Sequence, residues 1–178
     1  MEKQQLKYHW LLRVLHWVMA LIILSLIAVG YYMTGLEKND PSRPTLYMLH
    51  KSFGVTIFFL LLIRLSTRLK TTIPPLPETL SRVEKIWARR AHILLYFFMV
   101  VIPFTGYLMS TLSGYAVLWF SIPLPILWDK NPDVAAIMHE FHEIGAYTLL
   151  ALVFIHVAGV AKHRLYDKKE NDVLPRML

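Results

Sequence analysis

The sequence contains no cysteine among its 178 residues. This absence excludes disulfides, thiolate metal sites, iron–sulfur clusters and covalent attachment of a c-type haem. Charged residues are also scarce for a soluble domain, at 17% of the chain, whereas hydrophobic residues make up 56%. The composition therefore predicts a small integral membrane protein in which residues 1–178 form a single domain.

Four apolar segments are each long enough to cross a bilayer as a helix, at about 11–33, 46–63, 91–109 and 137–161. The first follows Lys3 and Lys7 as a signal peptide would, but its apolar run is too long and no small-residue cleavage site follows. Residues 110–136 contain Trp119 and Trp128, which favour an interfacial segment over a fifth span. The predicted fold is all-α, a four-helix transmembrane bundle that runs up-down-up-down.

Basic residues are unevenly distributed over the connections. The N-terminal tail, the connection between the second and third spans and the C-terminal tail hold fifteen of the nineteen lysines and arginines. The other four are Lys38, Arg43, Lys51 and Lys130. Positive charge favours the cytoplasmic side, so we expect both termini to be cytoplasmic. Membrane topology accounts for the net charge of +7, and no nucleic-acid partner is expected.

Four histidines fall inside the predicted spans at two depths. His16 and His156 lie near the expected cytoplasmic ends of the first and fourth spans, and His50 and His142 near the outer ends of the second and fourth. His142 and His156 are fourteen positions apart, which places them on one helix face and about 21 Å apart along the axis. The pattern predicts two histidine pairs, His16 with His156 and His50 with His142.

Imidazole pairs in a membrane interior favour axial ligation of haem iron, because a neutral imidazole adds no charge to the site. The alternative is that these histidines bond across helices or titrate in a proton pathway. Gly54, Gly145 and Gly159 lie on the histidine faces, where they either leave room for a macrocycle or let helices approach closely. The motif at His139 is H-E-x-H and lacks the ligand spacing of a zinc hydrolase.

Two further histidines lie at the expected cytoplasmic level. His92 follows two arginines at the start of the third span, and His163 follows the fourth span between Lys162 and Arg164. One interpretation is an interfacial side chain that reaches toward lipid headgroups. The other is a quinone site, in which an imidazole hydrogen-bonds a carbonyl oxygen and supplies protons during reduction.

Several short motifs in this order resemble those of the bacterial cytochrome b-561 family, over nearly the whole chain. They are His16-Trp17, Met48-Leu49-His50 with Gly54, Arg64 to Lys70, Pro74-Pro75, Ala91-His92, His142-Glu143, His156, His163 and the tail Lys169 to Met177. No single motif is specific, but their order and spacing together are.

The resemblance implies a bundle in the bacterial inner membrane with two b-type haems, ligated by His16, His156, His50 and His142. It also implies electron transfer from an outer-face donor to ubiquinone near His163. Members of the family include superoxide oxidases, so the expected activity is of the superoxide:ubiquinone oxidoreductase type.

The expected outer side carries six acidic residues against four basic ones, which does not favour an anionic donor overall. A local patch formed by Arg43 and Lys51 near the outer histidine pair would still attract superoxide. The other readings are a haem b relay or anchor subunit that receives electrons from a redox protein, and a proton-coupled transporter without haem. The transporter is disfavoured because no repeat symmetry or broken helix is evident.

Overall fold

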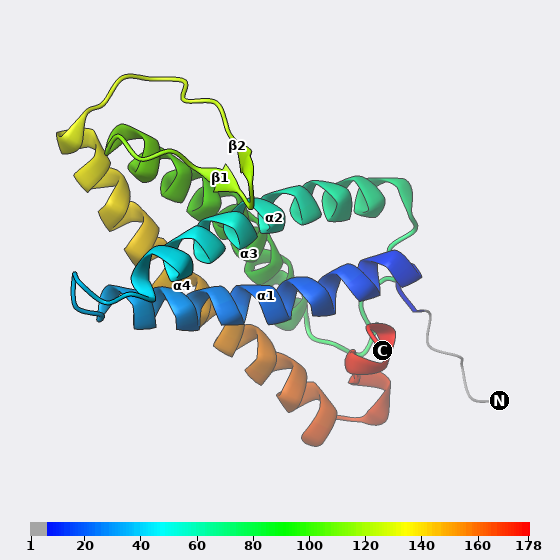
Figure 1. The fold of residues 1–178 in the computed structure, drawn as a ribbon. Coiled ribbons are helices and arrows are strands. Elements are labelled where there is room, and N and C mark those ends of the chain that lie inside the picture. Colours follow the sequence, from blue (N-terminus) through cyan, green and yellow to red (C-terminus); the bar gives the residue numbers. More distant parts are fainter. Residues whose placement is uncertain (1–6) are drawn as a thin grey trace.

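A computed structural model of the chain describes residues 7–178. Four long helices make up most of the fold (Figure 1). Their bounds are α1 Trp10–Thr34, α2 Arg43–Lys70, α3 Arg82–Leu112 and α4 Pro132–Leu165. Each helix is long and apolar enough to cross a membrane, and the predicted all-α four-helix fold is confirmed. Every helix extends beyond its predicted apolar span, because polar residues continue the first and last turns. Lys3, which contributes to the charge pattern, lies outside the described residues.

Local sequence signals fix where the last two helices begin. Ser81 and Glu84 form a capping box at the start of α3, in which each side chain accepts from the other residue's backbone N–H. Asn131 caps α4 by accepting from the Val134 N–H, and Pro132 follows it at the first turn, where a missing N–H costs nothing. These caps satisfy backbone donors that the helices leave unpaired.

Consecutive helices run antiparallel, and the pairs α1–α2 and α3–α4 cross each other (Figure 1). The packing is most extensive between α3 and α4 and between α1 and α2, whereas α1 and α4 touch little. After α4, the short 3-10 helices η1 (Lys169–Asn171) and η2 (Leu174–Arg176) return beneath the bundle. The backbone N–H of Tyr8 donates to the carbonyl of Arg176 at 3.1 Å, so the described N-terminal residues and the C-terminus lie at the same end.

The buried core lies between the first two helices. Leu15 and Met19 of α1 pack with Ile57 and Leu61 of α2, and Leu61 is fully buried. Many large apolar side chains elsewhere point outward, including Leu21, Phe97, Phe154 and Ile155. An apolar exterior of this kind is suited to lipid, which solvates it as well as a protein core would.

Residues 113–131, within the segment 110–136 that was predicted to be interfacial rather than a fifth span, contain no helix and form a small hairpin that the sequence did not predict. Strands β1 (Leu118–Trp119) and β2 (Ile122–Pro123) pair antiparallel. The hydroxyl of Ser52, which is fully buried in α2, accepts from the Phe120 N–H at 2.9 Å and lies 3.1 Å from the Leu118 carbonyl. Phe120 has a φ of 55°, a strained value that this bond helps to hold. The hairpin is therefore attached to α2 one half-turn from His50.

Candidate functional site

The first predicted histidine pair comes together across α1 and α4. The ring centroids of His16 and His156 lie 6.2 Å apart, with their planes inclined by 68°. Both side chains are half-buried. The backbones of α1 and α4 otherwise make few contacts, so the two imidazoles face each other across a space between these helices.

The second predicted pair comes together in the same way across α2 and α4. The centroids of His50 and His142 also lie 6.2 Å apart, with planes inclined by 72°. His142 Nδ1 lies 2.8 Å from the carbonyl oxygen of Ile102 in α3, which fixes the proton on Nδ1 and leaves Nε2 available as a ligand atom. His50 Nδ1 is buried and has no hydrogen-bond partner among the described residues.

The separation within each pair fits an iron ion between the two rings. Two imidazoles on opposite sides of one first-row metal ion have centroids about 6 Å apart, because each metal–nitrogen bond is about 2 Å and the ring centre lies about 1 Å beyond. A direct imidazole contact would bring the rings closer.

His92 lies against His156 but at a different separation. Their ring centroids are 5.2 Å apart, too close for an intervening metal ion, and His92 Nδ1 lies 2.6 Å from the carbonyl of Ala88. Of the two rings beside His156, only His16 has the spacing of a co-ligand. His92 thus lies beside the inner pair, whereas His163 makes its contact with Asp167.

The sequence left two interpretations open for the glycines near the histidines, namely room for a macrocycle and close approach of helices. The structure supports a different one at different positions. A Cβ built on Gly54 or Gly159 would meet nothing within 4 Å, which fits room for a macrocycle. A Cβ on Gly145 would lie 3.1 Å from Ile102 Cγ1, so the macrocycle interpretation is wrong at Gly145 and close helix packing accounts for that glycine.

Two glycines that sequence reasoning missed approach the outer pair directly. A Cβ on Gly106 would lie 2.8 Å from His142 Cε1, and one on Gly30 would lie 3.2 Å from His50 Cε1. Gly30 and Gly106 therefore leave the space in which the outer imidazoles lie. Their positions depend on which helix face meets a histidine on another helix, and the sequence carries no signal for that.

Arg64 is another residue of the site whose place there the sequence did not predict; the sequence placed it in the basic connection and in one of the motifs of the resemblance, but not beside a histidine. Its Nη1 donates to the Leu12 carbonyl at 2.5 Å and its Nε donates to the Tyr96 hydroxyl at 3.2 Å. A third contact, from Nη2 to His16 Nδ1, is long at 3.5 Å. Ligation of a haem iron through Nε2 would place the proton on Nδ1, so this third contact would then give way while the other two hold the guanidinium in place.

One of the two basic residues predicted near the outer pair, Lys51, lines a small cavity. Lys51 and Tyr47 lie on its α2 side and Leu118 of the hairpin lies opposite, around a volume of about 150 Å³. The Arg43 guanidinium lies over the Tyr47 ring, and the Lys51 ammonium lies 5.7 Å from the centroid of Tyr115. The local surface beside His50 is therefore positive.

A larger cavity opens between the outer ends of α1 and α4. Its volume is about 510 Å³. Its lining residues include three tyrosines and a carboxylate that directly follows His142 along α4: Tyr31, Tyr32, Tyr147 and Glu143. This cavity has a different chemistry from the small one, because it presents hydroxyls and a negative charge.

Comparison with known proteins places the chain in a family. Residues 7–178 match the family model described as prokaryotic cytochrome b561. The chain is 32% identical over 168 residues to "Cytochrome b561 homolog 2" of Escherichia coli (strain K12), covering 92% of this chain and 86% of that protein. It is 24% identical over 173 residues to "Probable superoxide oxidase CybB" of Yersinia pestis, covering 96% of each.

Four apolar helices that bring histidines together in pairs define a membrane protein of the electron-transfer class. The chain belongs to the prokaryotic cytochrome b561 family. Membership implies a b-type haem and a bacterial membrane location.

Proposed function

We propose that the chain carries electrons across the bacterial inner membrane through two b-type haems, with both termini cytoplasmic. His16 and His156 would hold the inner haem, and His50 and His142 the outer one. The observation that carries the proposal is the equal 6.2 Å separation within both pairs. Each haem supplies a one-electron carrier, and two at different depths are needed because a single one does not span the bilayer.

We propose superoxide as the outer donor and ubiquinone, bound near His163 with His92 in the vicinity, as the acceptor. Two superoxide ions each lose one electron to give dioxygen, and ubiquinone takes up both electrons and two protons to give ubiquinol. The support is the small cavity beside His50, whose positive lining by Lys51 would attract an anion despite the net negative outer side.

A second candidate donor is an organic reductant or redox protein, which would make the chain a relay or anchor subunit. The larger cavity supports this candidate. Its volume of about 510 Å³ suits a cyclic organic molecule rather than a diatomic ion, and the carboxylate of Glu143 would accept a proton that superoxide does not carry. The two candidates differ in whether oxidation of the donor releases protons on the outer side.

The haem content of the purified protein tests the ligation. We expect about two b-type haems per chain in the dithionite-reduced absorption spectrum, and one in each of the separate variants His142→Ala and His156→Ala. His139→Ala is the matched control on α4 and should retain both, because His139 belongs to neither pair. A colourless wild-type preparation would end the proposal.

The donor is tested on the oxidised wild-type protein. Superoxide generated in solution should reduce the haem faster than spontaneous dismutation removes the radical, and added quinone should then reoxidise it. If superoxide has no effect but a hydroquinone reduces the protein, the relay reading replaces the superoxide one.

A further inference from the structure

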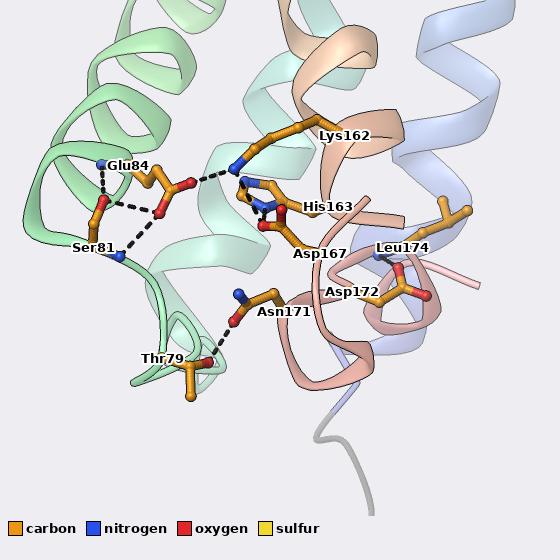
Figure 2. Close-up of polar contacts among 9 residues, drawn as sticks. All are labelled: Thr79, Ser81, Glu84, Lys162, His163, Asp167, Asn171, Asp172 and Leu174. Atoms are coloured by element: carbon orange, nitrogen blue, oxygen red, sulfur yellow. Dashed lines mark hydrogen bonds and ion pairs between the residues drawn. The ribbon is translucent and has the colours of Figure 1, made fainter. Parts of the chain in front are cut away.

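Charged side chains meet in series where α3 begins and α4 ends (Figure 2). The Lys162 ammonium contacts Glu84 Oε1 and lies 3.2 Å from Asp167 Oδ2. The same Asp167 oxygen accepts from His163 Nδ1 at 2.7 Å. Glu84 comes from the first turn of α3, whereas Lys162 and His163 are in the last turn of α4. The contacts therefore join α3 to the end of α4 through Lys162, and they continue through Asp167 to the His163 imidazole.

The exposed fraction of these side chains is larger at the Glu84–Lys162 end of the series than at the Asp167–His163 end. It is 48% for Lys162 and 31% for Glu84, but only 18% for Asp167 and 15% for His163. The imidazole is thus the least exposed member, and a carboxylate occupies its Nδ1 side. An imidazolium at His163 would be paired with the Asp167 carboxylate, and the contact with Lys162 holds that carboxylate in position.

Other charged groups surround the imidazole and belong to different elements. Lys162 and Arg164 flank His163 on α4, and Arg164 is engaged by Asp172 Oδ2 at 2.6 Å. The ligand atoms of Glu84, His163 and Asp167 lie within 4.8 Å of one another. Glu84 is the α3 contribution, and Asp172 follows η1. The Lys162 ammonium takes the position that a metal ion would need between the two carboxylates.

We propose that Asp167 and His163 form an acid dyad that protonates the reduced quinone, with Lys162 and Glu84 as positioning residues for Asp167. The proposal rests on the proposed function, in which quinone is reduced near His163. Asp167 holds the Nδ1 proton and stabilises the imidazolium, so that Nε2–H is the donor. Each of two cycles transfers one proton from Nε2 to the quinone, water then replaces that proton, and the haem pair supplies the two electrons.

Conservative variants separate charge from structure. Asp167→Asn keeps an oxygen beside Nδ1 but removes the negative charge. Glu84→Gln keeps the capping box, since glutamine serves at that position as well as glutamate, but removes the charge that holds Lys162. Lys162→Met removes the cation. Glu78→Gln and Lys85→Met are controls at the same end of the molecule, outside this series of contacts.

The first measurement is the rate at which a short-chain ubiquinone reoxidises the prereduced protein, followed at the haem band between about pH 5.5 and 9. We expect Asp167→Asn to lower this rate more at high pH than at low pH, because an opposite charge beside the imidazolium is lost. The rate at pH 8 should fall roughly tenfold and approach the wild-type rate at the acid end. Lys162→Met and Glu84→Gln should give smaller losses of rate than Asp167→Asn, because they act only through the position of Asp167, and both controls should give none.

The second measurement does not depend on turnover. In reduced protein with ¹⁵N-labelled histidine, assigned by the difference from His163→Gln, the wild-type signal should show the proton on Nδ1. Asp167→Asn should give a mixture of both tautomers. Haem content checks that each variant is folded.

The outcomes are distinct. If Asp167→Asn lowers the rate equally at every pH and leaves the tautomer unchanged, the dyad is wrong and Asp167 is only structural. If quinone fails to reoxidise the wild-type protein at any pH, the proposed function fails, and the nitrogen spectra still decide whether Asp167 fixes the tautomer of His163.

Discussion

His142 is oriented by the backbone of a neighbouring helix, since its Nδ1 lies 2.8 Å from the carbonyl oxygen of Ile102. One side of the ring is thereby held, and Gly106 lies against its Cε1 edge. The orientation of this predicted ligand is set by α3, which contributes no ligand itself.

Gly106→Ala should displace His142, because the new Cβ would lie 2.8 Å from Cε1. We expect loss of the outer haem with retention of the inner one, seen as a haem content of about half in the pyridine haemochrome assay. Gly35→Ala is the matched control, because its Cβ would meet only ordinary contacts at 3.6 Å. Full haem content in Gly106→Ala would contradict the geometry of the outer pair.

Arg64→Gln should lower the midpoint potential of the inner haem by tens of millivolts, where about 59 mV corresponds to a tenfold change for one electron. The guanidinium lies beside His16, and a positive charge there stabilises the reduced state. Potentiometric titration resolves the two haems. Arg82→Gln, at the start of α3, should leave both potentials in place, and an equal fall of both haems in Arg64→Gln would argue against a local effect.

Ser52→Ala should loosen the outer hairpin. The change removes the partner of the Phe120 N–H and of the Leu118 carbonyl, at a cost of about 0.5–1.5 kcal/mol for each lost hydrogen bond, because both residues are partly exposed. We expect faster proteolysis within residues 113–131 and a lower Tm in detergent. Ser66→Ala, at an exposed position of the same helix, is the control, and wild-type resistance in Ser52→Ala would mean that the hairpin is held by other contacts.

The stability of the end of the molecule that carries the C-terminus should depend on pH through Asp167. The hydrogen bond from His163, followed by that from Lys162, holds the pKa of the Asp167 carboxyl below its usual range. Since the folded pKa is depressed, the stabilisation is present above the unfolded pKa of about 3.9 and is lost as the pH falls through the folded value. The fall in Tm between about pH 6 and 3 should be smaller in Asp167→Asn than in wild type or in the distant Asp129→Asn. Equal falls in all three would show that Asp167 is not linked to folding.

Lys51→Met should slow reduction of the haem by superoxide severalfold at low ionic strength. Lys51 lines the small cavity beside His50, and steering of an anion by a local charge weakens as salt screens it. The difference from wild type should therefore shrink as salt is added, in stopped-flow measurements. Lys38→Met, in the loop after α1, is the control, and an unchanged rate in Lys51→Met would remove the small cavity as the point of entry.

The two histidine pairs could be predicted from the sequence, but the other side chains that contact them could not. The residues His16, His50, His142 and His156 could be grouped by depth, because a helix advances about 1.5 Å per residue and the spans have recognisable ends. That His92 also lies against His156 could not be predicted, because a side contact at one depth depends on the rotation of α3 about its axis. For the same reason Gly106 could not be connected to His142.

For the polar residues Arg64 and Ser52, too, the sequence predicted the position along the chain but not the contacts. The sequence assigned Arg64 to the basic connection, since a charged residue after an apolar run is ordinarily interfacial. The structure places it against His16, because α2 continues as a helix to Lys70 and carries the guanidinium toward α1. Ser52 gave no signal, because its partners come from the hairpin more than sixty residues later.

The sequence by itself determined that the chain spans a membrane as four helices, since long apolar runs leave no other way to satisfy the backbone in lipid. It also determined the depth of each histidine along its own helix, because the rise per residue is constant. Only the tertiary structure decided which rings face one another, how far apart they lie and which glycine, arginine or carboxylate lies against them. Those relations depend on helix rotation and crossing, which are set by the packing of many side chains together and are not encoded in any one segment.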